Sequence, residues 1–226
     1  MEMNILALDT AGAVLSLALS SPEGILVAEI DSGPRHSELL MDTADSLFKS
    51  AGLKREELNL TACMKGPGSF TGLRIGYAVA KGLSLALGIQ SASVPTLDCI
   101  AYHLSVWPGL VLPVIDAKKD CFFAAFYRHG TRLSDYLDAG AAVLSQKTNE
   151  LRLDAKEPVI LTGSGAPMLF PMLCENIQGL IVEPFSGRGR SLELLELVKK
   201  NTNLYTEDEN SGPLYLRKSD AELAGT

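Results

Sequence analysis

The segment GPGSFTGLRIG at residues 66–76 has the residue types and spacing that most directly suggest chemistry. Glycine-rich turns that lead into helices present backbone N–H groups, which bind phosphates and other anions. The segment lacks both the Gly-Lys-Ser/Thr ending of a P-loop and the spacing G-x-G-x-x-G, so its phosphate signal is weak. The residues of such a phosphate or nucleotide loop would be Asp9, Gly66, Gly68, Ser69 and Thr71.

Two aspartates occupy equivalent places in two similar stretches of the chain. Asp9 follows ILAL and Asp116 follows LPVI, and each precedes a short turn and a second apolar strand. Later in each half, a strand runs into a Gly-x-Gly turn and then a helix, in CMKGPGSF and ILTGSGAP. Any α/β protein contains some similar stretches by chance, but the two features occur in the same order in both halves, which favours a diverged internal duplication. We expect both aspartates to accept hydrogen bonds from their own hairpins rather than to hold a metal.

Few residues suit a metal site or a nucleophile. A metal-binding helical pair would place a second histidine four residues after His36, where the sequence has Leu40. Ser69 lacks the G-x-S-x-G context of a hydrolase nucleophile. The cysteines contain no C-x-x-C pair, which favours free thiols in a reducing compartment. We therefore expect no metal site and no catalytic residue.

The elements that must position these residues follow from hydrophobic patterning. Apolar runs at residues 4–9, 13–20 and 24–31, joined by short turns, predict an antiparallel meander. Helices are predicted from about residue 37 to Gly52 and over about residues 71–88, because apolar residues recur there at helical spacing. The segment SVWPG at residues 105–109 is a plausible boundary between an N-terminal domain, 1–107, and a C-terminal domain, 108–226.

The second predicted helix carries small residues four positions apart, at Gly72, Gly76, Ala80, Ser84 and Gly88. Glycine inside a helix costs up to about 1 kcal/mol relative to alanine, so a close packing partner is expected. The other faces of the helix are also apolar, which is typical of a helix buried on more than one side. The pattern alone leaves two alternatives, a partner protein or internal packing.

Composition limits the possible partners. Lys and Arg number 20 against 27 Asp and Glu, so the net charge is −7. A protein that binds nucleic acid by itself usually has a basic face, so direct binding of RNA is disfavoured. The N-terminus lacks a basic region before its apolar run, and no stretch is long and apolar enough to span a membrane. We expect a cytoplasmic protein with no membrane contact.

Six segments occur in the order found in the TsaB/YeaZ family: MNILALDT, RHSELL, GPGSFTGLRIG, DAKKDCFFAAFY, LTGSGA and PLYLR. They extend from Met3 to Arg217, and GPGSFTGLRIG is the most diagnostic. The chain resembles this family, whose members are similar to shortened relatives of the sugar kinase–Hsp70–actin superfamily. The resemblance implies an α/β fold of two ribonuclease-H-like (actin-like ATPase) subdomains, the second shortened.

The resemblance also implies a function. The chain would be a noncatalytic scaffold subunit of the complex that transfers a threonylcarbamoyl group to adenosine 37 of tRNAs reading ANN codons. It would activate or stabilise the catalytic paralogue TsaD, be joined by the ATPase TsaE, reach tRNA only through the complex and form homodimers. It would need no cofactor, and a nucleotide would bind only at the junction with TsaD. The alternative is an actin-like ATPase or other nucleotide-binding enzyme.

The expected partner interface combines the helical pattern with this resemblance. Its residues lie on the two predicted helices of the N-terminal half: His36, Leu39, Leu40, Thr43, Leu47, Gly72, Leu73, Gly76, Tyr77, Ala80 and Ser84.

Overall fold

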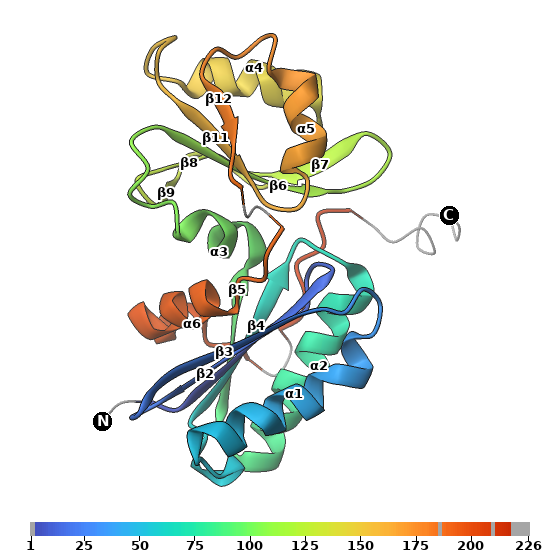
Figure 1. The fold of residues 1–226 in the computed structure, drawn as a ribbon, viewed down its shortest axis with the longest axis vertical. Coiled ribbons are helices and arrows are strands. Elements are labelled where there is room, and N and C mark those ends of the chain that lie inside the picture. Colours follow the sequence, from blue (N-terminus) through green and yellow to red (C-terminus); the bar gives the residue numbers. More distant parts are fainter. Residues whose placement is uncertain (1–2, 185–186, 209–210, 218–226) are drawn as a thin grey trace. The chain divides into compact units, whose positions relative to one another are not determined.

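The structure, a computed structural model, describes residues 3–184, 187–208 and 211–217 (Figure 1). The chain divides into two compact units. The first takes the chain up to Cys99 together with Arg188–Pro213, and the second takes Ile100–Gly187 and the chain from Leu214. This division differs from the expected domains, 1–107 and 108–226, because a C-terminal helix packs into the core of the first unit.

The first unit is built on a five-stranded sheet in the order β3-β2-β1-β4-β5. Strands β1 (Ile5–Asp9), β2 (Val14–Ser21) and β3 (Gly24–Asp31) form the predicted antiparallel meander. Strands β4 (Leu60–Gly66) and β5 (Gln90–Pro95) extend the sheet in parallel with β1. The meander prediction is therefore confirmed.

Helices cover both faces of this sheet (Figure 1). On one face, α1 (His36–Ala51) and α2 (Phe70–Leu87) pack on an apolar core that includes Leu8 and Leu17. On the other face, α6 (Ser191–Lys200) inserts Leu194, Leu195 and Val198 among residues of β1, β4 and β5. The short elements of this part of the chain are η1 (Arg55–Glu57), α3 (Thr96–Tyr102), which crosses the division between the units, and α7 (Thr202–Tyr205).

The second unit repeats the same plan with shorter strands. Its main sheet path is β10-β7-β6-β11-β12, formed by β6 (Leu110–Asp116), β7 (Cys121–Ala124), β10 (Leu137–Gly140), β11 (Val159–Thr162) and β12 (Leu180–Val182). A small hairpin of β8 (Tyr127–Arg128) and β9 (Thr131–Arg132) pairs with β6. Helices α4 (Ala141–Leu151) and α5 (Ala166–Leu173) complete the unit, and α5 contributes Leu169 and Leu173 to its core.

The two sheets share one topology, which confirms the α/β fold of two related subdomains. In each, the first strand of the unit is central, an antiparallel pair lies on one side of it, and two parallel strands lie on the other. The second copy is shortened, since β7 has 4 residues where β2 has 8. The predicted internal duplication is therefore visible in strand order and direction.

Candidate functional site

The glycine-rich turn before α2 packs against the β1–β2 turn. Ser69 is the N-cap of α2, and its side chain accepts a hydrogen bond from the Gly72 N–H at 3.2 Å. The Ser69 N–H donates to the Ala11 carbonyl at 2.8 Å. A Cβ at Gly68 would lie 2.8 Å from that same carbonyl oxygen. The N–H group of Ser69, a residue of the expected phosphate loop, and that of Gly72 are therefore engaged within the unit.

Asp9 is committed to its own unit as well. It is only 6% exposed, and its two carboxylate oxygens accept the Ala11 N–H at 3.0 Å and the Arg190 N–H at 2.8 Å. The Arg190 side chain is buried too, and it pairs with Glu193 at 3.3 Å. Burial raises the pKa of Asp9, and the two backbone N–H groups act against that rise. Both carboxylate oxygens of Asp9 are therefore engaged within the first unit.

Asp116, the equivalent residue of the second unit, caps its own hairpin. It accepts the Lys118 N–H at 2.7 Å and the Lys118 ammonium at 2.6 Å. These hydrogen bonds, led by the one from the side chain, lower the pKa of Asp116. The neighbouring glycine turn packs as closely as the turn before α2 does, because a Cβ at Gly163 would lie 2.4 Å from the Val114 carbonyl oxygen. Both aspartates thus accept a hydrogen bond from their own hairpins, as predicted, and Asp9 also accepts one from the distant Arg190.

The stripe of small residues on α2 faces the sheet of its own unit. A Cβ at Gly72 would lie 2.0 Å from the Thr10 carbonyl oxygen, and one at Gly76 would lie 2.6 Å from the Thr10 hydroxyl. Ala80 is fully buried, and its carbonyl accepts a hydrogen bond from Thr61 at 3.0 Å. Of the two alternatives left open by the sequence, internal packing is the one that the structure supports for these residues.

Most of the expected interface residues are therefore buried inside the first unit, and their part in a partner interface stays a prediction. The buried ones are His36, Leu40, Leu47, Gly72, Leu73, Gly76, Tyr77 and Ala80. The half-buried ones are Leu39, Thr43 and Ser84. His36 has a structural role, since its ring nitrogens hydrogen-bond with the Ser32 hydroxyl at 2.8 Å and the Gly12 carbonyl at 2.9 Å.

The opposite side of α2 carries the exposed residues. We call this side the outward face of α2, and it consists of Arg74, Ala78, Gly82, Leu85 and Ala86. Arg74, Ala78, Gly82 and Ala86 are four residues apart and Leu85 is three residues from Gly82, which places them on one side of the helix. Leu85 is 88% exposed, and apart from its chain neighbours and the backbone of its own helix, no atom lies within 4 Å of the position that a Cβ at Gly82 would take. Gly82 is thus a helical glycine without an internal packing reason.

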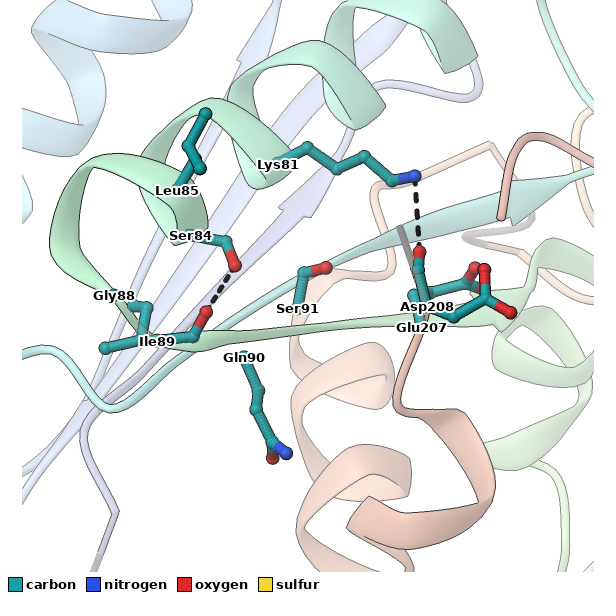
Figure 2. A pocket seen from close by; sticks show the side chains of 9 residues that line it. All are labelled: Lys81, Ser84, Leu85, Gly88, Ile89, Gln90, Ser91, Glu207 and Asp208. Atoms are coloured by element: carbon teal, nitrogen blue, oxygen red, sulfur yellow. Dashed lines mark hydrogen bonds between the residues drawn. The ribbon is translucent and has the colours of Figure 1, made fainter. Parts of the chain in front are cut away.

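A pocket of about 630 Å³ opens beside this face (Figure 2). One wall is the C-terminal end of α2, with Lys81, Ser84 and Leu85, and a second wall is the start of β5. The third wall is formed by Glu207 and Asp208, which are distant in the sequence. The Ser84 hydroxyl donates to the Ile89 carbonyl, which fixes the turn between α2 and β5.

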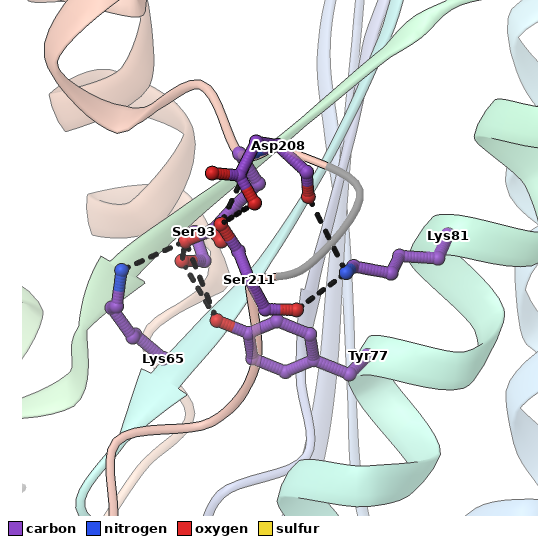
Figure 3. Close-up of polar contacts among 7 residues, drawn as sticks. Lys65, Tyr77, Lys81, Ser93, Asp208 and Ser211 are labelled. Carbon is purple, nitrogen blue, oxygen red and sulfur yellow. Dashed lines mark hydrogen bonds and ion pairs between the residues drawn. The ribbon is translucent and has the colours of Figure 1, made fainter.

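Glu207 is part of a polar network with Lys65, Tyr77 and Ser93, whose side chains point toward one another (Figure 3). Its side chain is 4% exposed and pairs with Lys65 of β4 at 2.9 Å. The Ser93 hydroxyl of β5 also donates to this carboxylate, and the Tyr77 hydroxyl of α2 lies 3.5 Å from it. Burial opposes ionisation of Glu207, but hydrogen bonds from two serines and from Lys65 outweigh it and lower its pKa. An acidic stretch of the C-terminal part of the chain thus contains a buried anchor at Glu207.

Among residues 3–184, 187–208 and 211–217, no group of three or more His, Cys, Asp or Glu side chains is arranged to hold a metal ion. No helix in the same residues is both long and apolar enough to cross a membrane. The cysteines Cys63, Cys99, Cys121 and Cys174 are free thiols.

Comparisons with known proteins agree with this architecture. The model of the family described as "tRNA N6-adenosine threonylcarbamoyltransferase" (TsaD) matches residues 27–224. The TsaB protein of Bacillus subtilis is 27% identical over 97% of this chain and 96% of its own length. A TsaB of Buchnera aphidicola is 35% identical over 73% of this chain and 76% of its own. YeaZ from Pseudomonas aeruginosa superposes with a TM-score of 0.77 over 95% of this chain and 100% of that one, at 22% identity.

A repeated sheet with an aspartate at the end of each first strand defines the sugar kinase–Hsp70–actin class of proteins. Within that class, the matching residues extend over nearly the whole chain. The chain belongs to the TsaB/YeaZ family.

Proposed function

We propose that this chain is the noncatalytic scaffold subunit of the complex that transfers a threonylcarbamoyl group to adenosine 37 of tRNAs reading ANN codons. The relatives are named as tRNA threonylcarbamoyladenosine biosynthesis proteins, which supports the pathway. In this role the chain binds and activates or stabilises TsaD, and it reaches tRNA only through the complex. TsaE and a second copy of this chain are its further partners. The chain needs no cofactor of its own.

The outward face of α2 is the observation that carries this proposal. A glycine in a helix interior costs up to about 1 kcal/mol relative to alanine, and Gly82 has no internal contact to account for that cost. Glycine and alanine allow another backbone to approach closely, and Gly82 is flanked one turn away by the exposed Ala78 and Ala86. Leu85 supplies an exposed apolar side chain, in keeping with the apolar character of the buried core of protein interfaces.

The engagement of Asp9 and Asp116 in hairpin hydrogen bonds supports the noncatalytic part of the proposal. An actin-like ATPase needs carboxylates that face the metal-bound phosphates. In this chain both acids accept hydrogen bonds from backbone N–H groups of their own units instead.

Light scattering after size exclusion, with and without purified TsaD, tests the proposal. We expect the wild-type chain to form a one-to-one complex with TsaD. Gly82→Trp, which places a large ring on the outward face of α2, should abolish the complex while the chain stays folded. Ala80→Trp is unsuitable, because Ala80 is fully buried and the ring would disrupt the core.

The matched control is Ala142→Trp, which introduces the same ring at an exposed position of α4 in the second unit. It should bind TsaD as the wild-type chain does. Equal binding by Gly82→Trp would show that the outward face of α2 is not the docking surface.

A further inference from the structure

Residues 206–208 and 211, here called the C-terminal arm, follow α7 and cover the edge of the first sheet. Thr206 forms an antiparallel bridge with Ala92, and the Glu207 N–H donates to the Ser91 carbonyl at 2.9 Å. Strand β5 is the last strand of this sheet. The arm therefore supplies partners to a strand edge that would otherwise present open hydrogen-bonding groups.

The Glu207 side chain joins the arm to three elements at once. It contacts Lys65 of β4, Ser93 of β5 and Tyr77 of α2 (Figure 3). A carboxylate that is 4% exposed is costly to bury unless its donors are in place. The arm is therefore expected to dock as one unit, with all three contacts formed together, or to leave as one unit.

The arm also holds the C-terminal half of α2 directly. The Lys81 ammonium donates to the Ser211 carbonyl and lies 3.5 Å from the Asp208 carbonyl oxygen. Tyr77 and Lys81 are one turn apart on α2, and each immediately precedes a residue of the outward face, Ala78 or Gly82. The contacts that the arm makes with Tyr77 and Lys81 therefore help to set the position of the outward face of α2.

We propose that the C-terminal arm is a latch that positions α2 for partner docking, and that Glu207 is the positioning residue that closes it. The docked arm also forms the third wall of the pocket beside Leu85 (Figure 2). Release of the arm would remove that wall and free α2 to shift. The part of this proposal that concerns docking rests on the proposed function; the latch itself does not.

Hydrogen exchange of the full chain, read by mass spectrometry, tests the latch. In Glu207→Ala we expect exchange at residues 81–87 and in the arm to be about tenfold faster, since a hydrogen-bonded charged group contributes on that order to a local opening equilibrium. Peptides of β1 and α1 should be unchanged. Glu23→Gln, which removes the same charge from an exposed turn, is the control and should match the wild-type chain. Unchanged exchange in residues 81–87 of Glu207→Ala would overturn the latch.

The affinity for purified TsaD tests the link to docking. We expect about a tenfold weaker affinity for Glu207→Ala and a wild-type affinity for Glu23→Gln. If Glu207→Ala fails to fold, Lys81→Met keeps the anchor, removes the clamp on α2 and should show the same two effects. Faster exchange with unchanged affinity would overturn the positioning role. No binding of TsaD by the wild-type chain would overturn the proposed function, and the exchange data would still decide the latch.

Discussion

At the scale of single residues, the glycines of α2 serve opposite purposes on opposite sides of one helix. At Gly76 an added methyl would lie 2.6 Å from the Thr10 hydroxyl, which itself donates to the Gly72 carbonyl at 2.7 Å. At Gly82 an added methyl would meet open space. The same residue type therefore allows close packing inside the unit at one position and leaves room outside it at the other.

This contrast predicts opposite effects of two alanine substitutions. Gly76→Ala should destabilise the chain by about 1–3 kcal/mol, the usual cost of overpacking a core. Gly82→Ala should be neutral or stabilising by up to about 1 kcal/mol, because alanine is the better helix former. Urea unfolding of the two variants and the wild-type chain measures both changes. A loss of stability in Gly82→Ala would contradict the open space beside Gly82, because it would mean that other atoms pack against this position.

Asp9 should matter for stability rather than for catalysis. Asp9→Ala leaves the buried N–H groups of Ala11 and Arg190 without their acceptor. Each unsatisfied buried donor costs about 1–3 kcal/mol, so the loss should reach about 2 kcal/mol or more. The free energy of unfolding in urea measures it. Wild-type stability in Asp9→Ala would mean that neither hydrogen bond contributes in solution.

At the scale of elements, the sequence was informative where the pattern is local. The meander of β1–β3, the start of α5 at Ala166 and the order of the two halves all follow from short apolar runs and turns. The side of α2 that faces the sheet could not be predicted from the sequence. A helix that is apolar nearly all round has no polar face that would show which side is exposed. The signal that could have found the outward face was Gly82, which lies off the stripe through Gly76 and Ala80.

The C-terminal arm was unpredictable for a different reason. Glu207 finds its partners at Lys65, Tyr77 and Ser93, more than a hundred residues away. No local periodicity records a pairing over that distance, and the acidic composition around Glu207 is typical of solvated loops. The sequence also does not show that the chain returns to the first unit after Gly187. The amphipathic pattern of α6 predicts a helix with one buried face, but not which unit it packs on.

The lowered pKa of Glu207 predicts that acid opens the arm. A carboxyl group whose folded pKa is below its usual value of 4.5 stabilises the folded state above that pH, and the stabilisation is lost as pH falls through the folded pKa. Protection of arm amides, corrected for intrinsic exchange, should be constant from about pH 7 to pH 5 and should fall below 4.5. In Glu207→Gln this pH dependence should be absent. An acid response that persists in Glu207→Gln would assign it to another group.

At the scale of the whole molecule, the two units share a framework of strands, and the polar residues at the strand ends make contacts within their own units. Each unit retains the first strand, the aspartate and the glycine turn of the fold class. In the first unit the turn is filled by Thr10 and Ala11, and in the second it is filled by the carbonyl of Val114. The acids at both strand ends serve their own hairpins. The glycine turns and the strand-end aspartates thus make packing and hydrogen-bond contacts within each unit.

This arrangement predicts that the isolated chain binds Mg-ATP weakly or not at all, with a dissociation constant above about 1 mM, equivalent to less than about 4 kcal/mol of binding free energy. A tighter site would need the Asp9 carboxylate to give up the N–H groups of Ala11 and Arg190, at a cost comparable to that of unfolding the hairpin contact. Isothermal titration of the chain alone, of Asp9→Ala and of the TsaD complex distinguishes the cases. Micromolar affinity in the isolated chain that Asp9→Ala abolishes would favour the ATPase alternative. Affinity that appears only in the complex would instead assign the nucleotide to the partner or to its junction with this chain, because Asp9 and Asp116 already accept hydrogen bonds within their own units.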